Sequence, residues 1–282
     1  MGQTIEIRPL SGALGAEISG VRIGGALTNE QFDRIYQAFN DYGAVLFRDQ
    51  ELTPQAQIDF ARRFGELERH PIVDGMEDHP EIIKVLKPAG ESASFGTGWH
   101  SDNSFLERPS LGSVLYGATI PPYGGDTLFA NQYLAYETLS DGLKRTLEGL
   151  SAVHSAGPAF TSDTAMEKYD GDTAIAYTWT DAVHEEVEHP VVCTHPDTGR
   201  KALYVNPMFT QRFAGWSAEE SRPLLEYLYA HATKPEFCCR FRWQEGSVAL
   251  WDNRCVQHYA IDDYRDFERV MYRVTIRGER PH

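Results

Sequence analysis

Close to the end of the chain stands the run Arg269-Val270-Met271-Tyr272-Arg273-Val274-Thr275-Ile276-Arg277. Because successive side chains of a β-strand point to opposite faces, this run predicts a strand with one arginine-rich face and one apolar face. A solvated arginine face is the ordinary explanation for a single strand. If helices cover the apolar face, however, the arginines point into the interior and need anionic partners. Arg269 and Arg273 are about 13 Å apart at roughly 3.3 Å per residue, which favours two different anions.

Strand-like runs occur along much of the remaining chain. They are rich in β-branched and aromatic residues and lie at 5–7, 44–47, 113–116, 127–130, 190–194, 202–205, 237–243 and 247–251. Helices are expected after the capping residues Thr28, Thr53 and Ser217, and leucine spacing indicates a further helical stretch at 133–150. This mixture predicts a mostly β fold with flanking helices, built as a barrel or a sandwich.

Length and composition limit the possible classes of protein. The 282 residues, 41% of them hydrophobic, can form a single core, so we expect one domain over residues 1–282, with the polar segment 155–188 as an insertion or lid. A net charge of −15 argues against nucleic acid and anionic membranes as partners and favours small molecules. The N-terminus has no signal-like pattern and no apolar run approaches about 18 residues, so a cytoplasmic protein is expected. The four cysteines lack metal-binding spacing and predict reduced thiols.

Two histidines and one aspartate form the strongest chemical signal. His100 and Asp102 lie in Trp99-His100-Ser101-Asp102, and His258 ends the run 251–258. Two imidazoles and one carboxylate hold non-haem Fe(II) on one face and leave other positions open, so this set indicates an oxygenase. A glycine-containing stretch precedes the first motif and apolar residues follow it, so its ligands stand next to an element anchored in a core.

Three other motifs combine a histidine with a nearby acid. His195-Pro196-Asp197 runs into Thr198-Gly199-Arg200 between two apolar segments, and therefore predicts a hairpin turn rather than a pair of ligands. His184-Glu185-Glu186 and His79-Pro80-Glu81 lie in acidic, aperiodic stretches that offer little rigidity, so solvated loops explain them better. A His-x-Asp triplet also arises by chance in so acidic a chain, and the motif at His100 depends on its surroundings for support.

Taken in order, several segments resemble the taurine dioxygenase and 2,4-dichlorophenoxyacetate dioxygenase family of Fe(II)- and 2-oxoglutarate-dependent oxygenases, over nearly the full length. The matching segments are Gly15-Ala16-Glu17-Ile18-Ser19-Gly20-Val21, Phe64-Gly65-Glu66-Leu67, Trp99-His100-Ser101-Asp102, Gly124-Gly125-Asp126-Thr127-Leu128, Ala135-Tyr136-Glu137-Thr138-Leu139-Ser140, Val205-Asn206 and Trp251-Asp252-Asn253-Arg254. The resemblance implies a double-stranded β-helix (jelly roll) with helices against one sheet, in agreement with the expected strands.

The same resemblance implies the cofactors and their ligands. Its iron ligands are His100, Asp102 and His258, while Arg269 and Thr127 contact 2-oxoglutarate, whose carboxylate suits a planar guanidinium. The implied reaction uses Fe(II) and O2, converts 2-oxoglutarate to succinate and CO2, and hydroxylates a second substrate. Relatives that halogenate lack the aspartate ligand, so the presence of Asp102 favours hydroxylation.

On the substrate side, the resemblance implies that Arg273 binds an anionic group, that His70 lines the same pocket and that Trp251 packs near the iron. The taurine enzymes carry a tyrosine and an asparagine where this chain has Val73 and Gly96, so two polar contacts are missing. A wider, more apolar pocket is expected to take a bulkier anion, such as an aryloxyalkanoate, a larger sulfonate or an alkyl sulfate. Hydroxylation of a carbon next to oxygen or sulfur would break the bond between them, and whether this chain cleaves or only hydroxylates depends on its substrate. Relatives are commonly dimers or tetramers, and a homo-oligomer is compatible with this resemblance.

Two other classes of protein would use part of the same residue set. A zinc-dependent hydrolase or a cupin-type isomerase can bind its metal with two histidines and one aspartate, but has no need of Arg269 and Thr127. A non-catalytic, anion-binding jelly roll would use the same polar groups structurally and would carry no metal. Neither class explains why the triad and the two arginines occur together.

Overall fold

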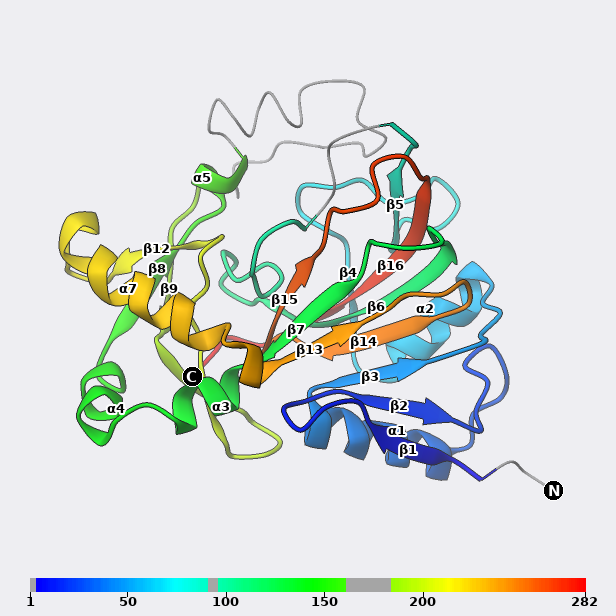
Figure 1. Ribbon diagram of the computed structural model, residues 1–282, viewed down its shortest axis with the longest axis horizontal. Coiled ribbons are helices and arrows are strands. Elements are labelled where there is room, and N and C mark those ends of the chain that lie inside the picture. Colours follow the sequence, from blue (N-terminus) through cyan, green and yellow to red (C-terminus); the bar gives the residue numbers. More distant parts are fainter. Residues whose placement is uncertain (1–3, 91–95, 161–183) are drawn as a thin grey trace.

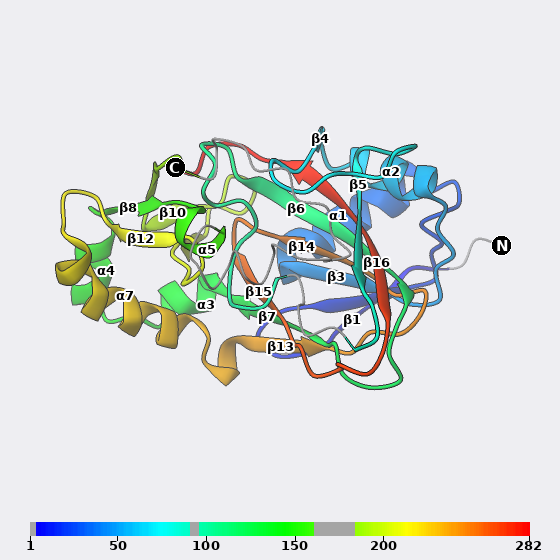
Figure 2. The same cartoon turned by 90° about the horizontal axis from the view of Figure 1, so that it is seen from above.

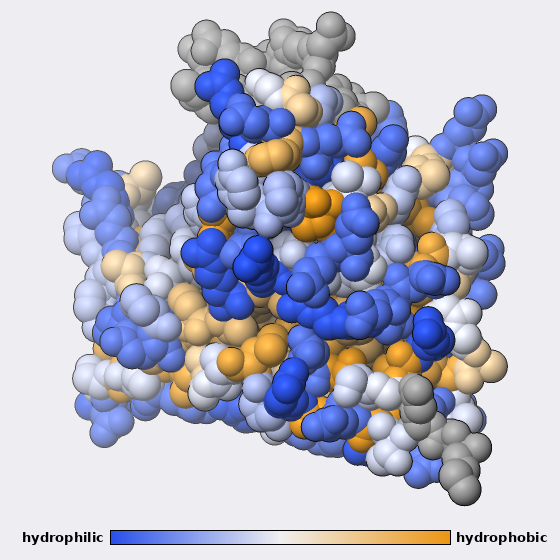
Figure 3. All heavy atoms as spheres, turned by 45° about the vertical axis from the view of Figure 1, so that its right-hand side comes forward, coloured by the Kyte–Doolittle hydropathy of each residue, from blue (hydrophilic) through white to orange (hydrophobic). Residues whose placement is uncertain are grey.

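The protein folds mostly into β-strands with several helices, as Figure 1 shows. The structure, a computed structural model, describes residues 4–90, 96–160 and 184–282. Among the helices within these ranges, none combines the length and the apolar character that crossing a membrane requires. Hydrophilic residues cover most of the face shown in Figure 3, with smaller apolar areas between them.

An eight-stranded sheet is the largest layer. Its strands are β1 (Glu6–Pro9), β2 (Ala16–Ser19), β3 (Ala44–Phe47), β4 (Leu67–Glu68), β5 (Ile82–Lys87), β6 (Ser110–Thr119), β14 (Val248–Asp252) and β16 (Arg269–Arg277). They run in the order β1-β2-β3-β14-β6-β16-β4, and β5 also pairs with β16. Between the described strands of this sheet, only β2 and β3 pair in parallel. The arginine-rich strand is therefore an interior strand of the sheet, with β6 on one side and β4 and β5 on the other.

Two helices cover the outer face of this sheet (Figure 2). They are α1 (Asn29–Tyr42) and α2 (Pro54–Arg62). Strand residues Val114, Val274 and Ile276 pack against them, and each fully buried side chain of this kind stabilises the fold by about 1.5–3 kcal/mol. Because the apolar face of β16 is used here, its arginine face must point the other way, into the molecule. The interior position predicted for Arg269 and Arg273 is confirmed, since both are buried.

A three-stranded sheet faces the inner side of the large one. It consists of β7 (Thr127–Asn131), β13 (Cys238–Phe241) and β15 (Val256–Ala260), in the order β13-β7-β15. Phe129 and Phe241 from this sheet pack with Leu46, Trp251 and Met271 from the large sheet. The space between the two sheets thus holds apolar side chains together with the inward-facing arginines of β16.

A third group of elements lies beside the two sheets, at the left of Figure 1. Its strands are β8 (Ser151–His154), β9 (Val187–Pro190) and β12 (Thr210–Phe213), ordered β12-β8-β9, and the hairpin of β10 (Val192–Thr194) and β11 (Lys201–Leu203). Its helices are α3 (Gln132–Glu137), α4 (Asp141–Leu147), α5 (Gly157–Phe160), α7 (Ala218–Ala232) and the short 3-10 helix η2 (Pro235–Phe237). Apolar residues of α3, α4, α7, η2, β8, β10, β11 and β12 share one core cluster, which includes Leu147, Phe213 and Leu228.

The capping residues located the helices correctly. Thr28 and Ser217 each form a capping box with the third helical residue, and the Thr53 hydroxyl accepts from the N–H of Ala56. The single helical stretch expected at 133–150 was wrong in part, because α3 ends at Glu137 and the side chain of Ser140 caps a separate helix, α4. Of the insertion expected at 155–188, residues 161–183 lie outside the described residues, and its last residues already belong to β9.

Candidate active site

A backbone bridge brings the predicted iron ligands together. His100 pairs with His258 on β15, each backbone N–H donating to the other residue's carbonyl, at 3.1 and 2.8 Å. The Nε2 atoms of both imidazoles lie 3.6 Å from Oδ1 of Asp102. All three side chains are buried, although 158 positions (258 minus 100) separate the two histidines in the sequence.

The three donors fit one divalent cation. Their ligand atoms lie within 4.8 Å of one another, and the 3.6 Å separations are too long for direct hydrogen bonds. Nδ1 of His100 lies 2.8 Å from the carbonyl oxygen of Gly98, so it carries the hydrogen and leaves the Nε2 lone pair toward Asp102. Burial, followed by the neighbouring His100, holds the pKa of His258 well below its usual range. Two neutral imidazoles and one carboxylate are a donor set for Fe(II).

The second carboxylate oxygen of Asp102 faces other groups. Four donors lie 2.8 to 3.2 Å from Oδ2, namely Arg273 Nη2, Ser113 Oγ, Trp251 Nε1 and Asn253 Nδ2. Burial alone would raise the pKa of Asp102, but the Arg273 guanidinium and the two histidines hold that pKa well below its usual range. The carboxylate is therefore ionised although it is buried.

The two residues predicted for the cosubstrate lie in a cavity beside the triad. Arg269 is buried, and its Nε and Nη2 atoms have no hydrogen-bond partner among the described residues. Burial lowers the pKa of Arg269, an effect that the nearby Tyr264 opposes. A buried guanidinium with open donors is costly unless an anion completes it, so the cavity suits a carboxylate. Its lining comprises Val85, Gly96, His100, Leu115, Thr127, Trp251, His258, Ala260, Arg269, Met271 and Arg273.

The predicted substrate residues His70, Val73 and Gly96 lie in two loops. Nδ1 of His70 accepts from the backbone N–H groups two and three residues further on, at 3.2 and 3.1 Å, so its Nε2 carries the hydrogen. Burial, and then Arg273, lower the pKa of His70 to about 3, which leaves it a neutral donor. Gly96 adopts a φ of 78°, and a Cβ there would stand 3.5 Å from Cε1 of His100. Gly96 thus borders the triad, while Val73 is buried beneath His70.

Arg273 has a partner that sequence reasoning missed. Its Nη2 lies 2.8 Å from Oδ2 of Asp102, and its Nε and Nη2 donate to Ser113 Oγ at 3.2 and 2.9 Å. Ser113 faces Thr275 across the β6–β16 pair, so it is a diagonal neighbour of Arg273 on the inner face. Asn253 was also missed as a site residue. For Ser113, the only sequence signal was its place on the inward-facing side of a predicted strand. For Asn253, it was membership of the matched segment 251–254.

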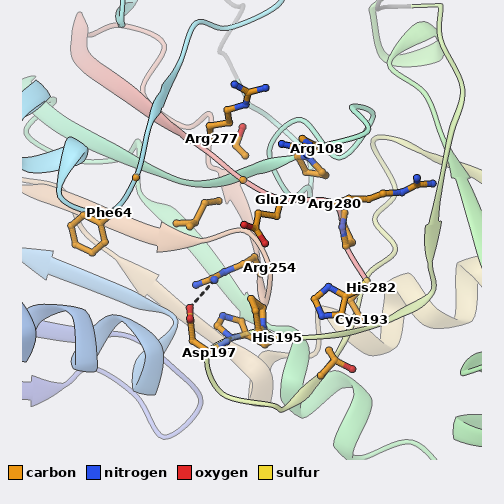
Figure 4. Close-up of a pocket in the computed structure, with 18 of the residues that line it drawn as sticks. Phe64, Arg108, Cys193, His195, Asp197, Arg254, Arg277, Glu279, Arg280 and His282 are labelled. Carbon is orange, nitrogen blue, oxygen red and sulfur yellow. Dashed lines mark hydrogen bonds and ion pairs between the residues drawn. The ribbon is translucent and has the colours of Figure 1, made fainter.

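A second cavity, with a volume of about 440 Å³, lies elsewhere (Figure 4). Residues 277–282 line it, together with the turn that contains Asp197. Three of its arginines are paired with acids: Arg254 lies 2.8 Å from Asp197, drawn as a dashed line, Arg277 lies 3.7 Å from Glu66, and Arg280 lies 3.3 Å from Glu107. None of the predicted site residues lines this cavity, so it is separate from the chemistry of the triad.

Asp252 forms a buried ion network beside that cavity. Its carboxylate accepts from Arg254 at 2.8 and 2.7 Å and lies 2.9 Å from Nε2 of His195. His195 begins the turn between β10 and β11, so the hairpin predicted at this histidine is confirmed. Cys255 lies close as well, but burial raises its pKa well above the usual range, and Arg254 already neutralises the carboxylate. This group is therefore a structural ion pair rather than a cation site.

Replacing Asp252 with asparagine is expected to destabilise the fold in a pH-dependent way. Burial would raise the pKa of Asp252, but Arg254 and His195 lower it to about 2, below its ordinary value of 3.8. A carboxyl group with a depressed pKa stabilises the folded state above the unfolded-state pKa and loses this effect as the pH falls. The contribution is about 2 kcal/mol at neutral pH and roughly half of that at pH 3. Urea unfolding of both proteins at pH 6 and pH 3 measures it, and a difference that grows toward pH 3 would contradict the assignment.

The sequence has close known relatives. It matches the family described as "Taurine catabolism dioxygenase TauD, TfdA family" over residues 6–275. An alkylsulfatase from Acinetobacter baylyi is 36% identical, covering 98% of this chain and 86% of the relative. An alpha-ketoglutarate-dependent sulfate ester dioxygenase from Pseudomonas putida is also 36% identical, covering 98% and 91%. The crystal structure of AAD-2 with Mn(II) and N-oxalylglycine has a TM-score of 0.78 and 31% identity, covering 99% of both chains.

These matches extend over nearly the whole chain and over nearly the whole of each relative. They select the oxygenase interpretation over the hydrolase, isomerase and anion-binding alternatives. The cofactors of this protein are accordingly Fe(II), 2-oxoglutarate and O2, and its substrates are small molecules. The chain belongs to the taurine catabolism dioxygenase TauD, TfdA family and is an Fe(II)- and 2-oxoglutarate-dependent dioxygenase.

Proposed function

We propose that His100, Asp102 and His258 bind the Fe(II) of this dioxygenase and that its prime substrate is an alkyl sulfate. The observation that carries the proposal is a buried triad beside a cavity in which Arg269 has open donors. When bound, Fe(II) together with 2-oxoglutarate and O2 supplies the oxidant that hydroxylates carbon. The protein's own contribution is to bind and orient the cosubstrate and the substrate and to exclude water from the site.

Arg269 and Thr127 bind 2-oxoglutarate in this proposal. The guanidinium of Arg269 offers Nε and Nη2, which are adjacent donors and match the two oxygens of a carboxylate. Thr127 Oγ1 accepts a hydrogen bond from Trp243 Nε1 at 2.9 Å, so its own hydrogen remains for the ligand. Met271, Val85 and Leu115 complete the lining and keep water away from the bound carboxylate.

The anionic group of the substrate binds to Arg273 and His70. His70 carries its hydrogen on Nε2, and its low pKa keeps the ring neutral throughout the physiological range. Arg273 uses Nε and Nη2 for Ser113 and Asp102, which leaves Nη1 for a substrate oxygen. A sulfate ester offers several acceptors with one negative charge, which suits one shared guanidinium and one neutral donor.

An apolar cluster next to the triad fits the carbon chain of the substrate. Its buried members are Ile72, Phe105, Ala156 and Phe209, with Leu106, Ala159 and Met208 packed against them. The ring of Phe209 lies 6.2 Å from that of His100, edge to face. Val73 and Gly96 add no polar contact, unlike the side chains of the taurine enzymes. The alkyl sulfate class is favoured over aryloxyalkanoates because two relatives at 36% identity are named for sulfate esters and alkyl sulfates.

Release of inorganic sulfate tests this choice of substrate. Hydroxylation of the carbon that bears the sulfate oxygen gives an unstable adduct, which collapses to an aldehyde and sulfate. With decyl sulfate, sulfate and succinate are expected in equal amounts, and kcat/KM is expected to exceed that for an aryloxyacetate by about tenfold or more. Ion chromatography measures the sulfate, and omission of 2-oxoglutarate is the control. Faster turnover of the aryloxyacetate, or succinate without sulfate, would redirect the assignment to another anion.

We also propose a double-stranded β-helix (jelly roll) as the architecture and a single catalytic domain over residues 1–282. The two facing sheets that enclose the triad support this architecture, as does the likeness to AAD-2. The ligands come from both sheets or their connections, with His258 on β15 and Arg269 on β16. The pair of sheets therefore carries His258, Thr127 and the two arginines, and the loops that carry the other site residues close around them.

A further inference from the structure

The two oxygens of Asp102 have different surroundings. Oδ1 faces the Nε2 atoms of His100 and His258, each at 3.6 Å, whereas Oδ2 is surrounded by four donors. A carboxylate with one oxygen fully hydrogen-bonded presents only the other oxygen to a metal, because rotation of the group would break those bonds. The orientation of the Asp102 carboxylate is therefore fixed by residues outside the triad.

Asn253 holds residue 102 by two bonds at once. Its Oδ1 accepts from the backbone N–H of Asp102 at 3.2 Å, and its Nδ2 donates to Oδ2 of the same residue at 3.2 Å. Trp251 Nε1 lies 3.1 Å from Asn253 Oδ1 and 3.2 Å from Asp102 Oδ2, which closes the network. The side-chain amide of Asn253 therefore binds both the backbone and the carboxylate of Asp102, and the carboxylate has little freedom to rotate.

Ser113 fixes the other side of the carboxylate. Its hydroxyl donates to Oδ2 of Asp102 at 3.2 Å and accepts from Nε and Nη2 of Arg273 at 3.2 and 2.9 Å. This places the guanidinium Nη2 only 2.8 Å from Oδ2. Ser113 therefore sets the distance between the proposed metal ligand and the arginine proposed for the substrate anion.

Both positioning side chains are held rigidly. Ser113 and Asn253 are 0% and 1% exposed. Ser113 lies on β6 opposite Trp251 on β14, and the backbone N–H of Asn253 donates to the carbonyl of Leu111 at 2.9 Å. Ser113 is thus placed by the large sheet itself, and Asn253, the first residue after β14, is anchored through its backbone to the neighbouring β6. Groups on rigid strands position a ligand more accurately than groups on loops.

We propose that Asn253 and Ser113 are positioning residues that keep Asp102 a one-oxygen metal ligand. The inference rests on the proposed metal site and adds residues that do not touch the metal. By occupying Oδ2, they prevent the carboxylate from using both oxygens and so leave the remaining coordination positions to cosubstrate and O2. Through Arg273, Ser113 also places the guanidinium that the substrate anion uses at a fixed distance from this carboxylate.

Titration with Co(II), whose visible absorption reports coordination number, tests the proposal without turnover. Asn253→Ala is expected to weaken Co(II) binding about 10- to 100-fold and to change the visible spectrum, as loss of an orienting partner does at other metal sites. Ser113→Ala should have the same direction of effect, and Ser113→Thr should restore wild-type binding because the hydroxyl is kept. Asn131→Ala is the matched control, since this buried amide bonds Ala13 and caps α3 but does not touch the triad.

The outcomes separate this inference from the proposed function. If the wild-type protein binds no Co(II), or Asp102→Ala binds it normally, the metal site itself is wrongly placed. If Asp102→Ala loses Co(II) while Asn253→Ala and Ser113→Ala bind it with unchanged affinity and spectrum, only the positioning role is overturned. Thermal unfolding checks that each variant is folded. Should Asn253→Ala not fold, the Ser113→Ala and Ser113→Thr pair decides the question.

Discussion

Replacing Asp102 with alanine is expected to lower kcat/KM by about 1,000-fold or more, because the variant loses the only carboxylate of the triad. Loss of a residue that merely orients a ligand costs about 10- to 100-fold in metal affinity or activity, and loss of the ligand itself should cost more. The two remaining ligands are histidines, whose imidazoles carry no negative charge, so none would be left facing the metal. Succinate formation and Co(II) titration measure the two consequences separately.

The Asp102→Ala variant is also expected to be less stable than the wild-type protein. Arg273 would keep its bonds to Ser113 but lose its buried ion pair, so some loss of stability accompanies the loss of activity. Asp252→Asn is the matched control, since it also breaks a buried ion pair, in the same segment 251–254. That control should lower the stability and still bind Co(II). Retention of coupled turnover in Asp102→Ala would show that the iron ligands are elsewhere.

The local signals of the sequence were reliable because the physics behind them is local. A capping residue satisfies backbone groups within one helical turn, so Thr28 and Ser217 mark helix starts without reference to the rest of the fold. Alternation in a strand is equally local. It located the buried face of β16, once helices were assumed on the other face, and so predicted that Arg269 and Arg273 are interior.

Contacts between residues far apart in the sequence could not be predicted from such local patterns. The bridge between His100 and His258 depends on the pairing of distant segments, and the resemblance to a family, not the spacing, supplied it. Ser113 carries no distinguishing pattern, since a serine in a strand is ordinary, and its role follows only from the register of β6 with β14 and β16. The same register makes Ser113 a neighbour of Arg273, because side chains on one face of paired strands lie side by side, and the loop that carries Asp102 then brings its carboxylate to both.

Replacing Arg269 with alanine is expected to raise the KM for 2-oxoglutarate by about 100-fold or more. Two open donors of a buried guanidinium would bind the carboxylate, and each hydrogen bond to a charged group contributes about 1.5–3 kcal/mol. Arg269→Lys keeps the charge but not the fork of donors, so it should recover only part of this loss. The measurement is uncoupled 2-oxoglutarate turnover without prime substrate, followed as succinate over a range of cosubstrate concentrations.

Comparison with Arg273→Ala distinguishes the arginine that binds 2-oxoglutarate from the arginine that binds the substrate anion. Arg273 lies four positions along the same strand and is equally buried, so both variants remove an interior guanidinium from β16. Arg273→Ala should raise the KM for the alkyl sulfate while leaving the KM for 2-oxoglutarate in uncoupled turnover within a few-fold, since Arg269 and Thr127, the donors proposed for 2-oxoglutarate, are unchanged. If Arg273→Ala loses 2-oxoglutarate binding and Arg269→Ala keeps it, the two anion sites are exchanged. The proposed substrate pocket would then move to the cavity around Thr127.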